Sequence, residues 1–266
     1  MKVEAAIERL NRFEATVLPE LAEFLRNLQN RDLAIKTKRN ARDLVTVADL
    51  ESEKRIVSFI RAAFPEDDVL AEEGGGDFGE ALTWVIDPVD GTVNYAHGLP
   101  LYAISIGLAW QGKPIAGLVH MPALRTTYRA AIGSGATCDG VPIGVTDTLE
   151  TSQSLVVTGF PYEREPIIDL LMTGVRSTLM NCRGIRRTGS AAIDLCWLAH
   201  GRFDAHYELN LAPWDTCAGE LIVREAGGRV TDLNGREHEL KHKSLLATNG
   251  RIHEDMLRIL SVFRSE

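Results

Sequence analysis

The spacing of apolar residues predicts helices at the start of the chain. Between residues 3 and 28, apolar side chains recur every three or four positions with charged residues between them, which is the period of an amphipathic helix. Pro19 interrupts this pattern, so we expect a kink or a new start after Leu18. A second helix is expected from Asp49, as its capping residue, to Pro65. Its predicted apolar face consists of Leu50, Ile56, Val57, Ile60 and Phe64.

The middle of the chain carries shorter apolar runs, broken by glycine and proline, that are typical of strands. These runs are 69–71, 82–86, 103–110, 115–120 and 127–131. The pair Asp139-Gly140 predicts a hairpin turn.

The second half of the chain mixes strands and helices without a regular alternation. Its predicted strands are 154–158, 185–188, 203–207, 229–232 and 244–248. Its predicted helices are 166–180, 190–200, 215–226 and a last one from about 251. This mixture favours α+β layers over repeated βαβ units. We expect one domain over 1–266, with two close-packed halves of roughly 1–150 and 151–266.

Composition narrows the class of protein. The chain is 45% apolar and 25% charged, which is ordinary for a globular protein and argues against disorder. The 29 Lys and Arg residues against 37 Asp and Glu residues give a net charge of −8, which disfavours nucleic acid as a partner. No apolar run approaches the roughly 20 residues that span a bilayer. With no signal-peptide pattern and sparse cysteines that form no CxxC, we expect a cytoplasmic protein with free thiols and no membrane partner.

The end of one predicted strand carries the strongest chemical signal. An apolar run leads into Asp87 and Asp90, with Pro88 between them and a Gly-Thr pair after them. A sharp turn there lets both carboxylates and the Val89 carbonyl face one point, and hard divalent cations prefer such oxygen ligands. If Gly91 and the next residue begin a helix, their backbone N–H groups point toward an anion. Taken alone, the segment is also compatible with a strand that ends in a polar turn.

Other carboxylates favour the metal site. Glu72 and Glu73 follow a strand end and precede a glycine loop, and at most one of them should reach the site because neighbours on an extended segment point oppositely. Asp215 opens a later helix, where by itself it is typical of a helix cap. Together with the aspartate pair, these residues supply the acidic ligands that a site for several metal ions needs.

These motifs resemble the inositol monophosphatase family of magnesium-dependent, lithium-sensitive phosphatases. Two signatures carry the resemblance: Trp84–Thr92 with Asn94, and Trp214-Asp215 followed by Ala218-Gly219 and the run 225–228. Further matching segments are 43–49, 71–73 and 187–192. Their order and separations match from about residue 40 to 230. One departure is Ala71, where the family commonly has glycine.

The resemblance implies a layered αβαβα sandwich of the inositol monophosphatase and fructose-1,6-bisphosphatase type. It also implies a homodimer and two or three Mg²⁺ ions in each active site. The positions that match the family's metal ligands are Glu72, Asp87, the Val89 carbonyl, Asp90 and Asp215.

The resemblance also assigns catalytic and substrate-binding positions. Asp49 is expected to partner Thr92, and Thr92 with Glu72 is expected to position and deprotonate the attacking water. The positions that match substrate contacts are Asp90, Gly91, Thr92, Ser190, Ala191, Glu208 and Asp215. Lys36 or Lys38 is either a further cation for the phosphate or part of a solvated basic loop. Arg186 and Arg187 are either exposed at a strand end or involved in specificity or an interface.

The implied function is magnesium-dependent hydrolysis of a small phosphate monoester of a polyol or sugar, most similar to inositol monophosphate. The segment 195–214, with Glu208 shortly before Asp215, and the compact length favour that substrate. Histidinol phosphate is the main alternative, followed by fructose bisphosphate, NADP and 3′-phosphoadenosine phosphates. An alternative of another class is a regulatory scaffold without catalysis. We do not expect a histidine metal site, because the acidic residues above supply the ligands that a magnesium site needs.

Overall fold

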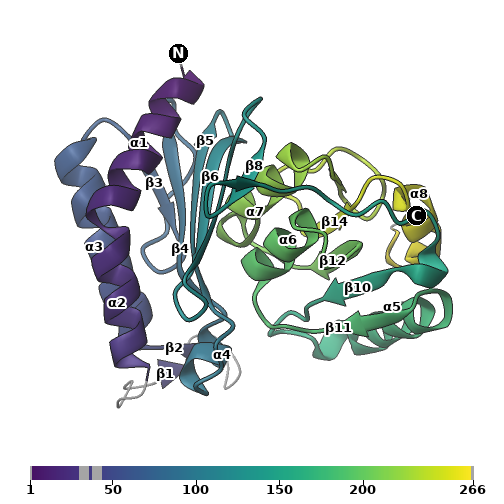
Figure 1. The fold of residues 1–266 in the computed structure, drawn as a ribbon. Coiled ribbons are helices and arrows are strands. Elements are labelled where there is room, and N and C mark those ends of the chain that lie inside the picture. Colours follow the sequence, from purple (N-terminus) through teal and green to yellow (C-terminus); the bar gives the residue numbers. More distant parts are fainter. Residues whose placement is uncertain (1, 30–35, 38–43, 265–266) are drawn as a thin grey trace.

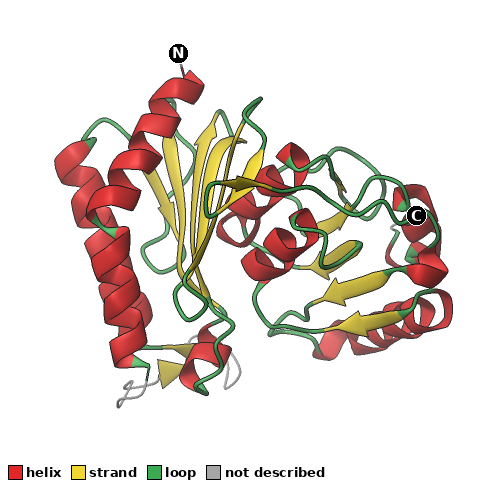
Figure 2. Cartoon of the chain, in the orientation of Figure 1, coloured by secondary structure: helices red, strands yellow, loops and turns green. Residues whose placement is uncertain are grey.

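Helices and sheets alternate in layers through the molecule (Figure 1). The computed structural model describes residues 2–29, 36–37 and 44–264. One group of helices covers the outer face of a first sheet, a second group lies between the two sheets, and a third covers the outer face of the second sheet (Figure 2). This arrangement is the expected αβαβα sandwich.

The first sheet has seven strands in the order β3-β4-β5-β6-β7-β8-β9. Only β3 and β4 pair in parallel, and the other neighbours pair antiparallel. Its strands are β3 (Asp68–Ala71), β4 (Thr83–Asp90), β5 (Ala103–Trp110), β6 (Lys113–Met121), β7 (Thr126–Ala131), β8 (Ala136–Cys138) and β9 (Val141–Pro142). Asp139 and Gly140 join the last two strands with φ values of 49° and 78°, which confirms the predicted hairpin turn.

Three helices cover the outer face of this sheet: α1 (Lys2–Thr16), α2 (Leu18–Leu28) and α3 (Val47–Ala63). The predicted break lies at Val17, since Pro19 occupies the first turn of α2, where its missing N–H costs nothing. Aromatic rings fill the space between helices and sheet, with Phe13 and Phe59 edge-on to Trp84. A short ladder of β1 (Lys36–Thr37) and β2 (Leu44–Val45) precedes α3.

Helix α3 begins earlier than predicted, and two predictions about it were wrong. Thr46 is the capping residue, and Asp49 lies at the third helical position, where its carboxylate accepts the Thr46 N–H at 2.8 Å. The two residues form a capping box, so the Thr46 hydroxyl caps the helix, which was the role predicted for Asp49. Leu50 is 49% exposed and does not belong to the buried face, whereas Ile56 and Ile60 are fully buried.

The second sheet has five strands in the order β11-β10-β12-β14-β13. The pairs β10–β11 and β10–β12 are parallel, and β14 pairs antiparallel with β12 and β13. Its strands are β10 (Leu155–Thr158), β11 (Gly184–Arg186), β12 (Ala205–Leu209), β13 (Arg229–Thr231) and β14 (Ser244–Thr248).

Two helices, α6 (Ala191–Ala199) and α7 (Pro213–Glu225), lie between the sheets. Small residues let α7 approach the first sheet closely, because a Cβ at Gly107 would lie 2.4 Å from the Cys217 sulfur. The outer face of the second sheet is covered by α5 (Ile168–Asn181) and α8 (His253–Ile259). Short 3₁₀ turns are Thr151–Gln153, Glu165–Ile167 and Ser261–Phe263.

Two further features bear on the expectations above. The four cysteines are free, with Cys196 and Cys217 buried and Cys138 and Cys182 partly exposed. Across the described ranges, every helix is too short or too polar to cross a membrane. The expectation of a single domain over 1–266 stays a prediction.

Candidate active site

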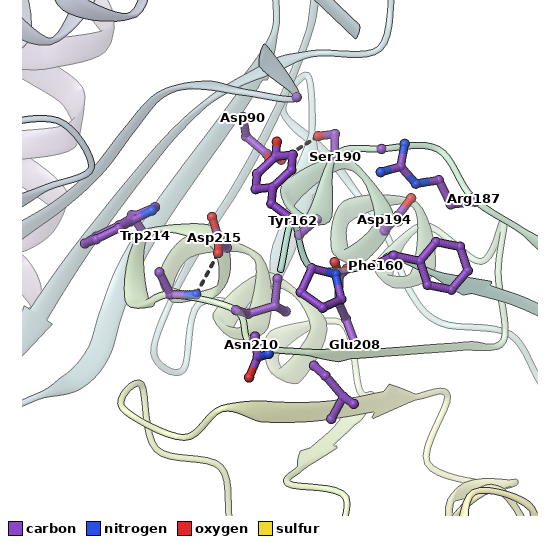
Figure 3. A pocket seen from close by; sticks show the side chains of 18 of the residues that line it. Asp90, Phe160, Tyr162, Arg187, Ser190, Asp194, Glu208, Asn210, Trp214 and Asp215 are labelled. Carbon is purple, nitrogen blue, oxygen red and sulfur yellow. Dashed lines mark hydrogen bonds between the residues drawn. The ribbon is translucent and has the colours of Figure 1, made fainter. Parts of the chain in front are cut away.

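A cavity of about 470 Å³ lies where the end of β4 meets the second half of the chain. Its walls come from distant parts of the sequence, which the fold brings together (Figure 3). The lining segments are Glu72, Asp90-Gly91, 159–163, Arg187, 189–191, Asp194, 208–212, Trp214-Asp215 and Lys243. Seven of the predicted site residues therefore line one cavity: Glu72, Asp90, Gly91, Ser190, Ala191, Glu208 and Asp215.

The end of β4 is bent as its sequence predicts. Its pairing with β5 shifts register between Asp87 and Asp90, and the Val89 N–H donates to Asp87 Oδ1 at 3.0 Å. Gly91 follows with φ 92°, and a Cβ there would lie 2.9 Å from the Leu101 carbonyl oxygen. Only glycine fits this position without strain. Helix α4 (Thr92–Ala96) begins directly afterwards, as predicted.

Three carboxylates gather beside the cavity. Single oxygens of Asp87, Asp90 and Asp215 all lie within 4.8 Å of one another, with the first two buried and Asp215 partly buried. Burial raises the pKa of Asp87 well above its usual range, and the charges of Glu72, Asp90 and Asp215 raise it further. Like charges this close repel one another in a low dielectric. A hard divalent cation fits such an all-oxygen acidic set and removes the repulsion.

Asp90 links the end of β4 to the start of α6. Its Oδ2 accepts a hydrogen bond from Ser190 Oγ at 2.5 Å (Figure 3). The same oxygen accepts the Ala192 N–H at 2.8 Å, at the start of α6. Burial raises the pKa of Asp90 to about 6, and these hydrogen bonds act in the opposite direction. The Ser190 hydroxyl also caps α6, since it accepts the Ile193 N–H. Ser190 thus supports Asp90 from the cavity wall.

Asp215 lies at the third position of α7, not at its start. Pro213 is the first helical residue, and the Asp215 carboxylate accepts the Ala212 N–H at 2.6 Å. The prediction that Asp215 opens the helix was therefore wrong by two positions, because the proline begins it. Burial and the nearby Asp90 charge raise the pKa of Asp215 well above its usual range.

Glu72 is a further carboxylate that lines the same cavity. The turn after it is held from α3, because Glu53 Oε2 accepts the Glu73 N–H at 2.8 Å. A Cβ at Gly74 would lie 2.8 Å from Glu53 Oε1, so the absence of a side chain there leaves room for this contact. Glu53 was not identified from the sequence, since a charged residue inside a helix carries no signal of a contact with a distant turn.

Thr92 and Asp49 are joined behind the metal cluster. The Thr92 hydroxyl donates to Asp49 Oδ1 at 3.0 Å, and the Val89 carbonyl lies 3.1 Å from the same hydroxyl. The other Asp49 oxygen accepts the Thr46 hydroxyl at 2.6 Å. The capping box of α3 thereby orients the carboxylate that faces Thr92. This is the partnership that the resemblance implies.

Glu208 forms the wall opposite the three aspartates. It is the next-to-last residue of β12, and a Cβ at Gly159 would lie 2.1 Å from its Oε1, so glycine makes room for the carboxylate. Burial raises the pKa of Glu208 to about 8, with Asp194 and Asp90 adding to the rise and Arg187 opposing it. Figure 3 shows Arg187 and Asp194 on this side of the cavity.

The structure shows which of the basic residues with an open role line the cavity. Arg187 lines the cavity, whereas Arg186 is exposed on the edge strand β11. Lys38 lies outside the described residues, and only the backbone of Lys36 is described, in β1. Lys243 lines the cavity and was not predicted to do so.

Sequence reasoning also missed Asp194, His206 and the segment 159–162. The signal for His206 was available, because residues i and i+2 of a strand share a face, and Glu208 was already a candidate. Asp194 lies one helical turn after Ser190, which would have placed it near the same wall. The segment 159–162 has no such signal, since only the fold brings it to the cavity.

The layered sandwich, with acidic residues beside a cavity between its halves, is the architecture of phosphatases of the inositol monophosphatase and fructose-1,6-bisphosphatase type. Over residues 7–263 the chain matches the inositol monophosphatase family, and it belongs to that family of metal-dependent phosphatases.

Individual relatives agree with this assignment. The chain is 42% identical over 229 residues to an inositol-1-monophosphatase of Synechocystis, covering 85% of this chain and 80% of the relative. It is 39% identical to a putative Nus factor SuhB of Neisseria meningitidis, covering 86% and 88% of the two chains. A solved structure of a Thermotoga maritima IMPase superposes with a TM-score of 0.88 at 34% identity, covering 96% of this chain and 97% of that one.

Proposed function

We propose that this protein is a magnesium-dependent phosphomonoesterase that hydrolyses myo-inositol monophosphate to myo-inositol and phosphate. The observation that carries the proposal is the convergence of Asp87, Asp90 and Asp215 beside a cavity whose opposite wall carries Glu208. The three aspartates suit metal ions, which in turn bind a phosphate. Glu208 suits the hydroxyls of a polyol. The family relationship to an inositol-1-monophosphatase supports this substrate.

Two or three Mg²⁺ ions would be held by Glu72, Asp87, the Val89 carbonyl, Asp90 and Asp215. When bound, magnesium offsets the negative charge of the phosphate and lowers the pKa of a coordinated water. The acidic cluster of a chain with net charge −8 would then attract an anionic substrate instead of repelling it.

The chain's own groups would position the reacting partners. The phosphate would lie against the turn Asp90–Thr92, where backbone N–H groups face it. Because the Thr92 hydroxyl donates its proton to Asp49, its oxygen is left to accept a hydrogen bond from the attacking water. Glu72 would accept the proton of that water. Positioning of this kind is the main contribution of a protein to phosphoryl transfer.

Substrate choice would depend on the side of the cavity that faces the alcohol. Glu208 would accept hydrogen bonds from substrate hydroxyls, and the backbone around Ser190 and Ala191 would contact the same group. We further propose that the enzyme is a cytoplasmic homodimer and is inhibited by lithium. Light scattering of the purified protein tests the dimer, and a Li⁺ titration of phosphate release tests the inhibition.

Phosphate release from a panel of substrates in the presence of Mg²⁺ tests the function. The panel is inositol 1-phosphate, histidinol phosphate, fructose 1,6-bisphosphate, NADP and 3′-phosphoadenosine 5′-phosphate, with Asp90→Asn as the inactive control. We expect the highest kcat/KM for inositol 1-phosphate and a loss of at least about a thousandfold in the variant. A higher kcat/KM for another substrate would be consistent with the metal-dependent mechanism and would refute inositol 1-phosphate as the preferred substrate.

The likeness to proteins named as Nus factors supports a second candidate function, in which the same fold binds a regulatory protein partner. Catalysis and such binding are separable. If both occur, Asp90→Asn abolishes hydrolysis and leaves binding of the protein partner unchanged in a pull-down. An active wild-type protein that binds nothing would refute the second function alone.

A further inference from the structure

A buried histidine lies directly behind the wall that Glu208 forms. His206 is fully buried, and neither ring nitrogen has a hydrogen-bond partner among the described residues. Each nitrogen nevertheless faces a carboxylate just beyond hydrogen-bonding distance. Nε2 lies 3.7 Å from Glu208 Oε2, and Nδ1 lies 3.8 Å from Asp194 Oδ2. Two unsatisfied polar atoms on one buried ring are costly, so the arrangement requires an explanation.

The pleat of β12 places the three side chains together. Ala205 and Tyr207 belong to the core cluster that α8 contributes to on the outer face of the sheet. Alternation therefore sends His206 and Glu208 to the opposite face, toward α6, which carries Asp194. β12 is the central strand, with β10 pairing on one side and β14 on the other, so the histidine is confined on both sides.

We propose that His206 is a positioning residue that orients Glu208 toward the hydroxyls of the substrate. In the substrate complex, Nε2–H donates to the Glu208 carboxylate, and Nδ1 accepts from the Asp194 carboxyl group. Asp194 is itself anchored, since its Oδ1 accepts the Thr188 hydroxyl at 2.5 Å. A chain of hydrogen bonds then runs from Thr188 to the substrate. This inference rests on the proposed function and deepens it.

The surroundings favour the protonation states that this chain of hydrogen bonds needs. Burial lowers the pKa of His206 to about 3, so the ring is neutral and has one donor and one acceptor nitrogen. Burial also raises the pKa of Asp194 well above its usual range, which leaves a proton to donate. Small rotations of either acid close gaps of 3.7 and 3.8 Å to hydrogen-bonding distance.

The charges around Glu208 explain why a neutral donor is useful there. Burial disfavours its ionised form, and Asp194 and Asp90 are acidic neighbours, whereas Arg187 is the opposing cation. A hydrogen bond from Nε2–H favours the ionised carboxylate without adding a charge to the site. An ionised Glu208 accepts hydrogen bonds from several hydroxyls, which suits a polyol.

Kinetics with two substrates test the inference. Inositol 1-phosphate has hydroxyls for Glu208, and p-nitrophenyl phosphate has none. The variant His206→Phe keeps a planar ring and removes both nitrogens. We expect it to raise the KM for inositol 1-phosphate about tenfold, with kcat within about twofold, because a hydrogen bond to a charged group is lost. Its KM for p-nitrophenyl phosphate stays within about twofold of the wild-type value.

Conservative variants separate the two nitrogens. The amide nitrogen of His206→Gln reaches the position of Nε2, and that of His206→Asn reaches the position of Nδ1. We expect the glutamine variant, and not the asparagine variant, to restore the KM for inositol 1-phosphate. If His206→Phe does not fold, the comparison of these two variants tests the inference by itself.

A double-mutant cycle shows whether His206 acts through Glu208. Glu208→Gln alone raises the KM for inositol 1-phosphate, and adding His206→Phe raises it no further if one residue acts through the other. His253→Phe is the matched control. That histidine is also fully buried and bonds to Thr231 and Thr248 from the far side of the second sheet, so its loss lowers stability and leaves both KM values unchanged.

The outcomes distinguish this inference from the proposed function. Equal effects of His206→Phe on the two substrates, or additive effects in the double mutant, would overturn the positioning role while wild-type hydrolysis of inositol 1-phosphate still supports the function. A wild-type protein that hydrolyses p-nitrophenyl phosphate and not inositol 1-phosphate would overturn both the substrate and the role of His206.

Discussion

At the scale of single residues, the site depends on acids whose charges oppose one another. Asp87 is 2% exposed, and four further carboxylates are near enough to raise its pKa: Glu72, Asp90, Asp215 and Asp49. Such a cluster costs stability without a cation and gains stability when a cation binds. The same residues therefore link folding to metal binding.

Asp87→Asn tests this link. Without metal, in EDTA, we expect the variant to unfold at a higher temperature than the wild type, by roughly 3 °C, because one of the repelling charges is gone. With Mg²⁺ present, the wild type gains stability and the variant gains much less. Thermal unfolding by circular dichroism measures both. Glu66→Gln, an exposed acid distant in sequence from the cluster, is the control and should leave both temperatures unchanged.

The sequence alone predicted this cluster in part. Asp87 and Asp90 were identified as a metal-binding pair because they are close in sequence at a strand end. Asp215 and the pair Glu72-Glu73 were candidates from the sequence as well, but the choice of Glu72 and the placing of all four in one site rested on the family resemblance, since nothing in local spacing joins residues so far apart. Asp194 and His206 were missed although their spacing from Ser190 and Glu208 offered a signal, whereas their closeness to each other depends on the packing of α6 on β12.

At the scale of elements, the ends of neighbouring strands build the wall that faces the substrate alcohol. β10 and β12 run in parallel, so Gly159 after β10 and Glu208 in β12 reach the same edge. The absence of a side chain at Gly159 allows the carboxylate to lie against the backbone, 2.1 Å from where a Cβ would be. Strand packing thus fixes where Glu208 can lie.

Gly159→Ala should displace Glu208 without unfolding the protein, since the side chain that must move is long and flexible. We expect the KM for inositol 1-phosphate to rise by roughly five- to tenfold, and the KM for p-nitrophenyl phosphate to change little. Steady-state kinetics with the two substrates measure this. Gly144→Ala is the matched control, because its added Cβ has only an ordinary contact, 3.7 Å from the Ala226 carbonyl. Unchanged kinetics in Gly159→Ala would contradict the role of Glu208.

Element positions were predicted well where the periodicity was strong, and less well at their ends. The helices before residue 29 and the long strands of the first sheet follow the apolar pattern closely. The start of α3 was misplaced because Thr46 and Asp49 form one capping box, in which either residue looks like the cap. Leu50 was misplaced because an apolar residue next to the buried face can still be exposed.

At the scale of the whole molecule, the site exists only where the two halves meet. Asn94 Nδ2 donates to the Leu101 carbonyl at 2.8 Å and to the Thr188 carbonyl at 2.9 Å, which ties the end of the first sheet to the segment before α6. The Asp90–Ser190 hydrogen bond crosses the same junction. Conditions that weaken the packing of the halves should therefore affect the site as well as the fold.

Acid should lower the stability of the fold. Burial lowers the pKa of both His120 and His253 from 6.5 to about 4. The unfolded chain binds protons on these residues below about pH 6.5, whereas the folded chain does not until about pH 4. The stability that these two neutral histidines contribute to the fold is therefore fully present above pH 6.5 and is lost as the pH falls toward 4.

His253→Gln should reduce this loss by roughly 2 kcal/mol between pH 7 and pH 5, although it lowers stability at pH 7. Urea unfolding at the two pH values measures the change. Replacement of the exposed His97 by glutamine is the control and should leave the pH dependence as in the wild type. A variant with the full wild-type loss of stability would contradict the assignment of a neutral, buried His253.

The central claim is that the cluster of Asp87, Asp90 and Asp215 holds the magnesium that hydrolysis needs. The most direct test is phosphate release from inositol 1-phosphate while Mg²⁺ is titrated into metal-free protein, for the wild type and for Asp215→Asn. The account predicts no release without Mg²⁺, a saturable rise in the wild type, and a half-saturating concentration raised at least about tenfold in the variant. Release that persists in EDTA, or identical titration curves for the two proteins, would contradict it.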